Sequence, residues 1–516
     1  MTREHFSRRE FIGAAGLGIG LGMTLPGATS QAQQVYPSPQ YPPDPPPEYP
    51  QLRVRPNIAS LGEQQLAALK TGVSVMKSRP ATDPTSWSFQ ANIHGTLGPV
   101  TSPLFNQCEH GTIQFLTWHR GYIYFFERIL RLASGDPTLN LPYWDWTTAP
   151  ALPSAYRSPA DEASNPLYDG TRQINNGAQL PSSVVVDDLN TALGFIDFST
   201  PVFTGFSPSL EGSPHGAVHT LIGGNMGFVP TAANDPIFWL HHCNIDRLWN
   251  RWLNQDAGRA DPSDSAFLNQ TYSYADENGQ TVTLRVADML TSAQLGYRYD
   301  SVPNPLAARD VVAMAAVAGA AGDPPAKEMK EVASSAPRGR GVAAAAEAEA
   351  KPLGYKEETV NLTVVAEAGP ALNSAVATAD AVHHNELILE IQGLSFEQPP
   401  EYTYEVLLNL PDQASAERAR LHRVGTVNFF VGQHTHGAHA ADGGKPVTFD
   451  QRFDITGLVS RLRESGSFDT ENLTVTLRPI SPIPPEGQEE EQKQRATASA
   501  EKAGITYQRI NILVKP

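Results

Sequence analysis

The chain has 516 residues, which is too long for one compact core, so we expect two or three globular units with connecting segments. Hydrophobic residues make up 40% and aromatic residues 8%, which excludes a chain that is disordered throughout. The 38 basic and 54 acidic side chains give a net charge of -16, which argues against a nucleic-acid partner. The only cysteines are Cys108 and Cys243, so no disulfide framework holds the fold together.

The beginning of the chain has the features of an export signal. Arg8 and Arg9 precede a short apolar stretch, residues 13–26, and a cleavage pattern of small residues follows. An N-terminal membrane anchor is the alternative, but this stretch is too short and too rich in glycine to cross about 30 Å of hydrocarbon. We therefore predict that residues 1–32 are a twin-arginine signal peptide and that the mature protein is periplasmic or secreted, without membrane attachment.

Composition divides the remaining chain into four segments. Residues 33–50 are rich in proline and should form an extended arm. Residues 51–302 show helical patterning with long loops, whereas residues 303–354 are an alanine-rich stretch of low complexity, which indicates a linker open to proteases. Residues 355–516 contain short runs with a period of two, which predicts an all-β sandwich. The predicted strands are Val360–Val365, Glu386–Ile391, Tyr402–Leu408, Val427–Val431, Leu473–Leu477 and Ile505–Val514.

Two long helices are predicted in the segment 51–302. Residues 111–133 carry an apolar and aromatic stripe at helical spacing. Asp235 and Pro236 precede the second helix, residues 237–253, because aspartate caps helices and proline suits their first turn. The aromatic side chains of both helices are expected to fill a bundle core rather than to touch substrate. They include Trp118, Phe125, Phe126 and Phe238.

Seven of the 14 histidines lie in three clusters of this helical segment. A single buried histidine is most often a packed residue, but two groups of three imidazoles can build adjacent metal sites on a bundle of four helices. Coordination by imidazole alone favours copper, zinc or iron over magnesium or calcium, and copper heads the affinity order. The clusters are His94, His110 and His119, then His215 and His219, and finally His241 and His242.

The local positions of these histidines give further expectations. His94 is expected in a loop, and His110 and His119 should flank the start of the aromatic helix. His215 and His219 are four residues apart, which places two imidazoles on one face of a helix. A zinc-dependent hydrolase with a single site of three histidines would leave three imidazoles unexplained.

Long motifs surround the histidine clusters. Residues 108–110, 115–120 and 143–146 read CEH, FLTWHR and YWDW, and residues 215–219 and 234–249 read HGAVH and NDPIFWLHHCNIDRLW. These motifs resemble the first and second copper regions of tyrosinases, catechol oxidases and molluscan haemocyanins. The resemblance implies a mainly α catalytic domain, a four-helix bundle that holds two copper ions and takes dioxygen as co-substrate. It implies that CuA is held by His94, His110 and His119, and CuB by His215, His219 and His242, with His241 left to packing.

The resemblance continues beyond the second copper region. Residues 266–299, which end in a Tyr-x-Tyr pattern, resemble the segment that closes the catalytic domain of plant polyphenol oxidases before a linker and a β-rich shielding domain. Arg53 and Arg55 are predicted to pair with these tyrosines through cation–π contacts or hydrogen bonds. Over the C-terminal unit the resemblance concerns architecture only.

The resemblance also implies roles for residues next to the ligands. Glu211 would orient a water near CuB and help to deprotonate phenols. Gly216 stands where many strong monophenol hydroxylases have asparagine, which weakens the case for efficient hydroxylation. Val229 stands at the gate position above CuA, where a small side chain would leave the copper accessible, so the two cues conflict.

Three other residues near the ligands are assigned as follows. Cys108 is predicted to form a thioether with His110, as in family members with this spacing, because a free thiol beside an oxidising copper site is vulnerable; a plain buried thiol is the alternative. Cys243 is expected to be a small packing residue. Asp246, one helical turn after His242, is placed to orient an imidazole or a nearby arginine. The alternative for Asp246 is a surface salt bridge with Arg247 or Arg251.

An aromatic pair in the C-terminal unit suggests a plug. Phe429 and Phe430 precede three histidines, His434, His436 and His439, in what is most simply a solvated loop. The sharper hypothesis is that Phe429 or Phe430 at a tip of this unit blocks the copper pocket, and that cleavage of the linker activates the enzyme.

The sequence thus predicts an exported type 3 copper oxidase that converts o-diphenols, and some monophenols, to o-quinones with dioxygen. An o-aminophenol oxidase would share all the ligands. A haemocyanin-like oxygen carrier would share them too, although a twin-arginine leader on one chain without repeats argues against it. The expected partner is a small phenolic substrate, and assembly into a homo-oligomer is left open.

Overall fold

The structure is a computed structural model, and its described residues belong to one compact unit, residues 38–516. The predicted signal peptide, the proline-rich arm and the histidines between positions 434 and 439 lie outside the described residues. No helix within the described part of the chain is long and apolar enough to cross a bilayer. The described ranges are 52–201, 203–256, 258–302, 341–346, 351–379, 387–430 and 447–514.

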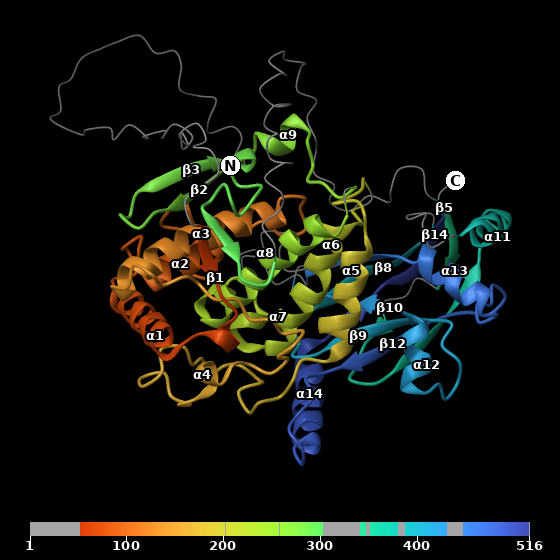
Figure 1. The fold of residues 1–516 in the computed structure, drawn as a ribbon. Helices are drawn as coiled ribbons and strands as arrows, with labels where there is room; N and C mark the ends of the chain where they lie inside the picture. Colours follow the sequence, from red (N-terminus) through yellow and green to blue (C-terminus); the bar gives the residue numbers. More distant parts are fainter. Residues whose placement is uncertain are drawn as a thin grey trace, which may run out of the picture. The chain divides into compact units, whose positions relative to one another are not determined.

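Four helices carry or flank the histidine clusters (Figure 1). They are α2 (Trp87–His94), α3 (Phe115–Ser134), α7 (Ala217–Ile222) and α8 (Ile237–Gln255). As predicted, Asp235 caps α8, since its carboxylate accepts a hydrogen bond from the Ile237 amide at 2.9 Å. The other helical segments before residue 302 are α1 (Glu63–Ser78), α4 (Ser154–Arg157), α5 (Leu189–Gly194), α6 (Phe206–Leu210) and α9 (Ser265–Leu268), the π-helical turns Ser183–Asp188 and Glu211–Gly216, and the 3₁₀ turns Ile58–Ser60, Gly224–Gly227, Ala232–Asn234 and Val286–Asp288.

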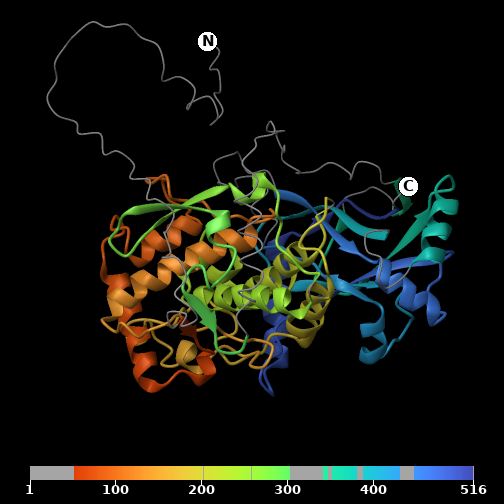
Figure 2. The same cartoon turned by 45° about the horizontal axis from the view of Figure 1, so that its top comes forward.

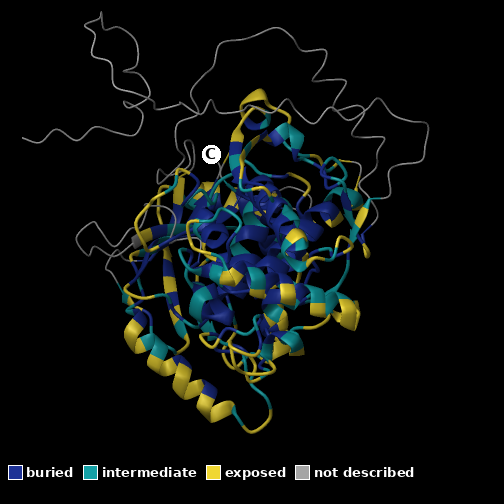
Figure 3. Ribbon diagram, turned by 90° about the vertical axis from the view of Figure 1, so that its left-hand side faces the viewer, coloured by how far each residue is buried: buried dark blue, intermediate teal, exposed yellow. Residues whose placement is uncertain are grey.

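Aromatic packing holds α3 against α8. The rings of Phe126 and Trp239 stack with centroids 3.4 Å apart, and Phe238 lies 4.2 Å from the His242 ring. The aromatic residues predicted to fill the core, Trp118, Phe125, Phe126 and Phe238, are all buried. Figure 3 shows the central helices coloured almost entirely as buried. The histidine clusters therefore lie in a dry, tightly packed interior.

The two ends of the helical part meet in a small parallel sheet. Strand β1 (Arg53–Arg55) pairs with β4 (Tyr297–Tyr299). The Arg55 guanidinium lies 3.6 Å from the centre of the Tyr297 ring and donates a hydrogen bond to the Tyr299 hydroxyl at 3.2 Å. The predicted pairing of this arginine with the tyrosines is confirmed. A separate hairpin consists of β2 (Thr271–Ala275) and β3 (Thr281–Arg285).

The C-terminal part is built on a ten-stranded sheet (Figure 2). Its strand order is β10-β9-β12-β7-β5-β14-β8-β13-β6, and β11 pairs with β8. The strands are β5 (Gly341–Ala345), β6 (Lys351–Pro352), β7 (Glu358–Val364), β8 (Leu387–Phe396), β9 (Thr403–Leu408), β10 (Arg423–Thr426), β11 (Val447–Asp454), β12 (Leu473–Ile480), β13 (Thr506–Tyr507) and β14 (Arg509–Val514). The predicted β-rich architecture is confirmed.

Several details of this part differ from expectation. Strands β5 and β6 both lie inside the stretch 303–354 that was interpreted as a linker. The alanines of β5 are small enough to pack between β7 and β14, and β6 pairs with β13. Strand β10 ends at Thr426, so residues 427–430, the described part of the predicted strand Val427–Val431, do not form a strand. Within the described residues of this part, four helices also join the strands, although the sequence suggested an all-β unit. They are α11 (Gly369–Thr378), α12 (Ala416–Leu421), α13 (Thr456–Glu464) and α14 (Glu489–Ala503).

Candidate metal centre

The first three histidines come from two helices and the loop between them. His94 is the last residue of α2, so the expectation of a loop was wrong; Ser86 caps this helix by accepting a hydrogen bond from the Phe89 amide at 3.1 Å. His110 lies before α3, and His119 lies on α3. The ring of His110 lies 5.3 Å from that of His94 and 4.9 Å from that of His119, so the structure brings the three together.

The second group comes from one kinked segment and α8. His215 lies in the π-helical turn Glu211–Gly216 and His219 on α7, so the pair does not share one regular α-helix as predicted. Their ring centroids are nevertheless 4.7 Å apart. The His242 ring on α8 lies 5.1 Å from that of His215 and 5.5 Å from that of His219.

The two groups are adjacent in the core. The rings of His119 and His242 stack with centroids 4.4 Å apart, and those of His110 and His215 stack at 5.6 Å. At this spacing, two metal ions held by the separate groups would be close neighbours. The arrangement suits chemistry that one small molecule undergoes with two metals at once.

Backbone carbonyls fix the orientation of four of these imidazoles. The Nδ1 atoms of His94, His119, His215 and His219 lie 2.8–3.1 Å from the carbonyl oxygens of Val229, Phe115, Glu211 and Met226. A carbonyl can only accept, so each Nδ1 carries the ring proton and each Nε2 keeps its lone pair. This is the tautomer that a metal ligand needs.

Burial keeps the three histidines of the second group neutral. Burial lowers the pKa of His215 to about 3 and lowers the pKa values of His219 and His242 well below their ordinary value. Neighbouring imidazoles lower the pKa of His219 and His242 further. Imidazoles that stay neutral across the physiological range offer lone pairs rather than repelling a cation.

The adjacent pair His241 and His242 both lie close to the second group. One ligand atom each of His215, His219 and His241 lies within 4.8 Å of the others, whereas Nε2 of His242 lies 3.4 Å from Nε2 of His219. The indole N–H of Trp146 donates to Nδ1 of His241 at 3.2 Å. Since this neutral ring must then carry its proton on Nε2, that atom has no lone pair for a metal.

Cys108 and Glu211 border the two groups. The Cys108 sulfur lies within 4.8 Å of a ligand atom of both His94 and His110, a proximity that suits the predicted thioether. Glu211 is buried and accepts a hydrogen bond from the Gly111 amide at 2.6 Å. Burial raises the pKa of Glu211 well above its ordinary value, so a proton on this carboxyl group is retained more readily than in water.

The two residues expected to tune substrate access are both buried. Gly216 ends the π-helical turn, with φ −66° and ψ −32°, a conformation open to any residue. Val229 is 3% exposed, and its carbonyl lies next to Nδ1 of His94. Each residue therefore adjoins one of the two histidine groups.

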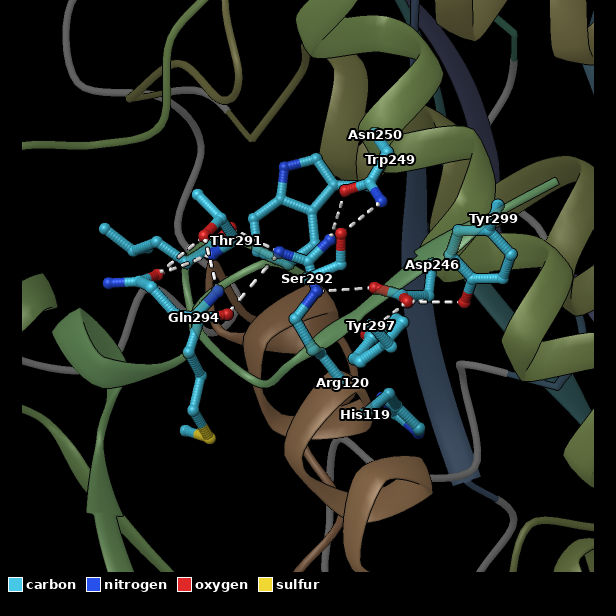
Figure 4. A network of polar contacts seen from close by, with 12 residues as sticks. His119, Arg120, Asp246, Trp249, Asn250, Thr291, Ser292, Gln294, Tyr297 and Tyr299 are labelled. Atoms are coloured by element: carbon cyan, nitrogen blue, oxygen red, sulfur yellow. Dashed lines mark hydrogen bonds and ion pairs between the residues drawn. The ribbon is translucent and has the colours of Figure 1, made fainter. Parts of the chain in front are cut away.

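Asp246 connects α3 and α8, two helices that carry histidines of the two groups (Figure 4). Its carboxylate accepts hydrogen bonds from Arg120 Nε at 2.5 Å and from the hydroxyls of Tyr297 and Tyr299 at 2.6 and 2.5 Å. Burial alone would raise the pKa of Asp246, but Arg120 and Arg55 hold it below its usual range. This is a buried network next to His119, not the surface pair with Arg247 or Arg251 that was the alternative.

The C-terminal part reaches the metal centre with one ring. Phe430 stacks on the His219 imidazole with centroids 3.8 Å apart and planes 11° apart. It also lies 5.5 Å from the ring of His110 and 5.7 Å from that of His215. Phe429 instead packs with Phe396 inside the C-terminal part. Sequence reasoning found the aromatic pair but not which member faces the histidines, since that depends on a turn.

The donor set fits two copper ions. Each group offers three buried imidazoles without a carboxylate among them, a set that suits copper better than magnesium or calcium. A helical core with two such groups side by side defines a binuclear copper protein of type 3.

Known domains match most of the chain. The common central domain of tyrosinase matches residues 84–188 and 154–255, and the polyphenol oxidase middle domain matches residues 261–311. A domain of unknown function (DUF7868) matches residues 342–490. The structure of latent apple tyrosinase covers 90% of this chain and 97% of its own with a TM-score of 0.55 and 24% identity, so the fold is shared.

Sequence relatives identify the family. Tyrosinase HcTyr1 of Hahella sp. (strain CCB-MM4) is 30% identical over 484 residues, which cover 83% of this chain and 96% of the relative. A chloroplastic polyphenol oxidase of Malus domestica is 28% identical over 478 residues, which cover 83% of this chain and 75% of the relative. The chain belongs to the tyrosinase and polyphenol oxidase family, whose members are copper-dependent oxidoreductases that act on phenols.

Proposed function

We propose that this protein oxidises o-diphenols, and some monophenols, to o-quinones, and that it is made in a latent form. The observation that carries the activity is the contact between the two groups of buried imidazoles, with the rings of His119 and His242 stacked at 4.4 Å. Bound copper would supply the binding and reduction of dioxygen. The protein's own residues orient the ligands, exclude water and position the phenol.

We propose that CuA is held by His94, His110 and His119 and CuB by His215, His219 and His242. His242 is assigned in preference to His241 because Trp146 forces the proton of His241 onto Nε2. His242→Asn should therefore lower copper from two ions per chain to one, whereas His241→Asn should keep two. Copper analysis of both purified variants tests the assignment, and the opposite result would exchange their roles.

The residues around CuB suggest how a phenol is handled. The ring of a diphenol would stack on His219 where Phe430 lies, and the buried Glu211 would accept or hold a proton near the phenol oxygen. Gly216 adds no side chain there, which disfavours hydroxylation of monophenols, while the small side chain of Val229 leaves room over CuA. We therefore expect diphenol oxidation to be the stronger activity.

Latency follows from the place of Phe430. Its ring occupies the face of His219 that an incoming aromatic substrate would use. Cleavage within residues 303–340, followed by release of the C-terminal part, would remove this ring. The enzyme would then gain activity without any change in its copper ligands.

The signal peptide is a separate part of the proposal. Arg8 and Arg9 precede the apolar stretch, and export through the twin-arginine route would deliver the protein already folded. Replacing both arginines by lysine should keep the protein in the cytoplasm at full length. Fractionation with a Sec-dependent protein as control checks this, because that control should still be exported.

The first experiment measures copper content, oxygen uptake and quinone absorbance with 4-methylcatechol and then tyramine, before and after limited proteolysis. Two copper ions per chain and quinone formation that rises after cleavage are expected. Reversible oxygen binding without turnover in the cleaved protein would instead indicate an oxygen carrier. Quinone formation that is equally fast before cleavage would retain the oxidase and refute latency.

A further inference from the structure

Gly216, which directly follows a proposed CuB ligand, is in contact with the C-terminal part of the chain. A β-carbon placed on Gly216 would lie 2.2 Å from Oδ1 of Asn428 and 2.5 Å from both Cγ and Nδ2. Real β-carbons do not approach other heavy atoms so closely, so the Asn428 amide fills the space that any side chain at position 216 would need.

Asn428 cannot simply turn away, because its side chain shapes the turn that carries the plug. The side-chain Oδ1 of Asn428 accepts a hydrogen bond from the backbone N–H of Phe430 at 2.9 Å. The backbone N–H of Asn428 donates to Gln451 Oε1 at 2.8 Å. Gln451 on β11 is in turn bonded to the Thr426 carbonyl at 3.0 Å. Moving the Asn428 side chain therefore breaks its hydrogen bond with the Phe430 backbone, which holds the Phe430 ring on His219.

The backbone does not require glycine at position 216. Its φ and ψ, −66° and −32°, are those of an ordinary right-handed helix. Alanine there would even favour the helical state over glycine. What glycine provides at this position is room, and Asn428 uses that room.

We infer that the absence of a side chain at Gly216 makes room for the Asn428 side chain. A side chain at position 216 would both occupy the CuB pocket and displace Phe430 from His219. The inference rests on the proposed latency and deepens it. One residue then links two properties, the shape of the pocket beside CuB and the closure of that pocket by the C-terminal part. A change from glycine toward a larger residue would relieve latency at the same time as it alters the choice of phenol.

The test is Gly216→Ala in the full-length, copper-loaded protein, with activity given as the ratio of uncut to cleaved enzyme. This ratio corrects for any direct effect of the new methyl group on turnover. We expect it to rise by about tenfold or more over wild type, because the methyl group overlaps the Asn428 amide. Gly212→Ala is the matched control, since no atom lies within 4 Å of its new β-carbon, and its ratio should stay that of wild type.

A double variant separates this clash from a general loss of packing. Asn428→Ala removes all three overlapping atoms and loosens the turn by itself. If the amide is the obstacle, Gly216→Ala should add less than about twofold in the Asn428→Ala background, against the large effect in wild type. Equal effects in both backgrounds would overturn the inference.

A second readout does not depend on the loaded enzyme. Amide hydrogen exchange of residues 423–430 in copper-free, uncut protein should be faster in Gly216→Ala than in wild type or Gly212→Ala. Unchanged exchange together with an unchanged activity ratio would refute the inference that Asn428 needs the room left by Gly216. A wild-type protein whose activity does not rise on cleavage would instead refute latency itself, so the two failures are distinct.

Discussion

Asp246 and Asp188 are two of the buried carboxylates that meet buried arginines, and their pairs join different parts of the chain. Asp246 binds Arg120 and lies 3.5 Å from Arg55, and all three belong to the helical part. Asp188 binds Arg423 of strand β10, so its pair crosses from the helical to the C-terminal part. Every one of these side chains is at most 5% exposed.

The two pairs differ in whether they remain intact in the active enzyme. The Asp246 cluster ties the first and last strands of the helical part to α3 and α8, and it must persist in the active enzyme. The Asp188 cluster is also bonded to Ser213 at 2.5 Å and to Thr426 at 2.7 Å, yet on our proposal it separates when the C-terminal part leaves. Burial and pairing of charge are similar, so on our proposal a pair is permanent when both partners belong to the same part of the chain, helical or C-terminal.

The largest effect is expected from Asp246→Ala. The buried Arg120 guanidinium would lose its carboxylate, whereas Arg55 keeps Glu127 at 2.5 Å. The uncompensated charge of Arg120 costs about 3–5 kcal/mol in the free energy of unfolding. Urea unfolding of the cleaved enzyme, followed by tryptophan fluorescence, measures this. Glu357→Ala in the full chain is the contrast, because its ion pair with Arg478 is exposed and should contribute about 0–1 kcal/mol. Similar losses in the two variants would contradict the comparison.

Arg423→Ala should act on latency rather than on the stability of the helical part. Asp188 would stay buried without its cation unless the C-terminal part moves away, so uncut activity should rise by about tenfold, equivalent to about 1.4 kcal/mol of docking free energy. After cleavage the enzyme no longer contains position 423, so cleaved variant and wild type must be equal. Glu405→Ala is the control, since Glu405 binds Arg423 at 2.9 Å within the C-terminal part. An uncut variant as latent as wild type would show that the pair does not hold the two parts together.

The sequence predicts what is periodic or locally encoded. The aromatic stripe of α3 and the Asp235 cap of α8 follow from spacing and capping preferences, and both are present in the structure. Strand β11 was missed because Gln451 stands between Phe449 and Phe453, where the alternation would need an apolar residue. Helix α14 was missed because it is polar around most of its circumference, so it has no stripe to detect.

Contacts between distant residues leave no such trace. Asp188 and Arg423 are 235 positions apart, and nothing in either local sequence indicates that they meet. Gly216 was recognised as unusual next to His215, but only the structure shows Asn428 in the space it leaves. The motifs indicated which histidines we propose as ligands, whereas the carbonyls that orient them become visible only in the structure.

A smaller effect is expected from Tyr299→Phe. The phenol hydroxyl donates to Asp246 at 2.5 Å and accepts from Arg55 at 3.2 Å, and its loss should cost about 1 kcal/mol in urea unfolding of the cleaved enzyme. Combining it with Tyr297→Phe removes both hydroxyls from the carboxylate. We expect the pair to cost more than the sum of the single changes, because each hydroxyl partly replaces the other. Strict additivity would mean that the two hydroxyls act independently on Asp246.

The smallest effect should come from Arg420→Ala. Arg420 lies at the exposed edge of the contact between the helical and C-terminal parts, whereas Arg423 lies in the interior of that contact. Arg420 is 59% exposed, lies 3.5 Å from Asp187 and donates to Ser182 at 3.0 Å. Water replaces these partners easily, so the docking free energy should fall by less than about 0.5 kcal/mol and uncut activity should change by less than about twofold.

Measuring Arg420→Ala and Arg423→Ala at low and at high salt sharpens the distinction. Salt should reduce the small effect of the exposed residue and leave that of the buried one, because screening reaches only solvent-exposed charges. If Arg420→Ala relieved latency as strongly as Arg423→Ala, the C-terminal part would be held by its charged edge rather than by its buried pair.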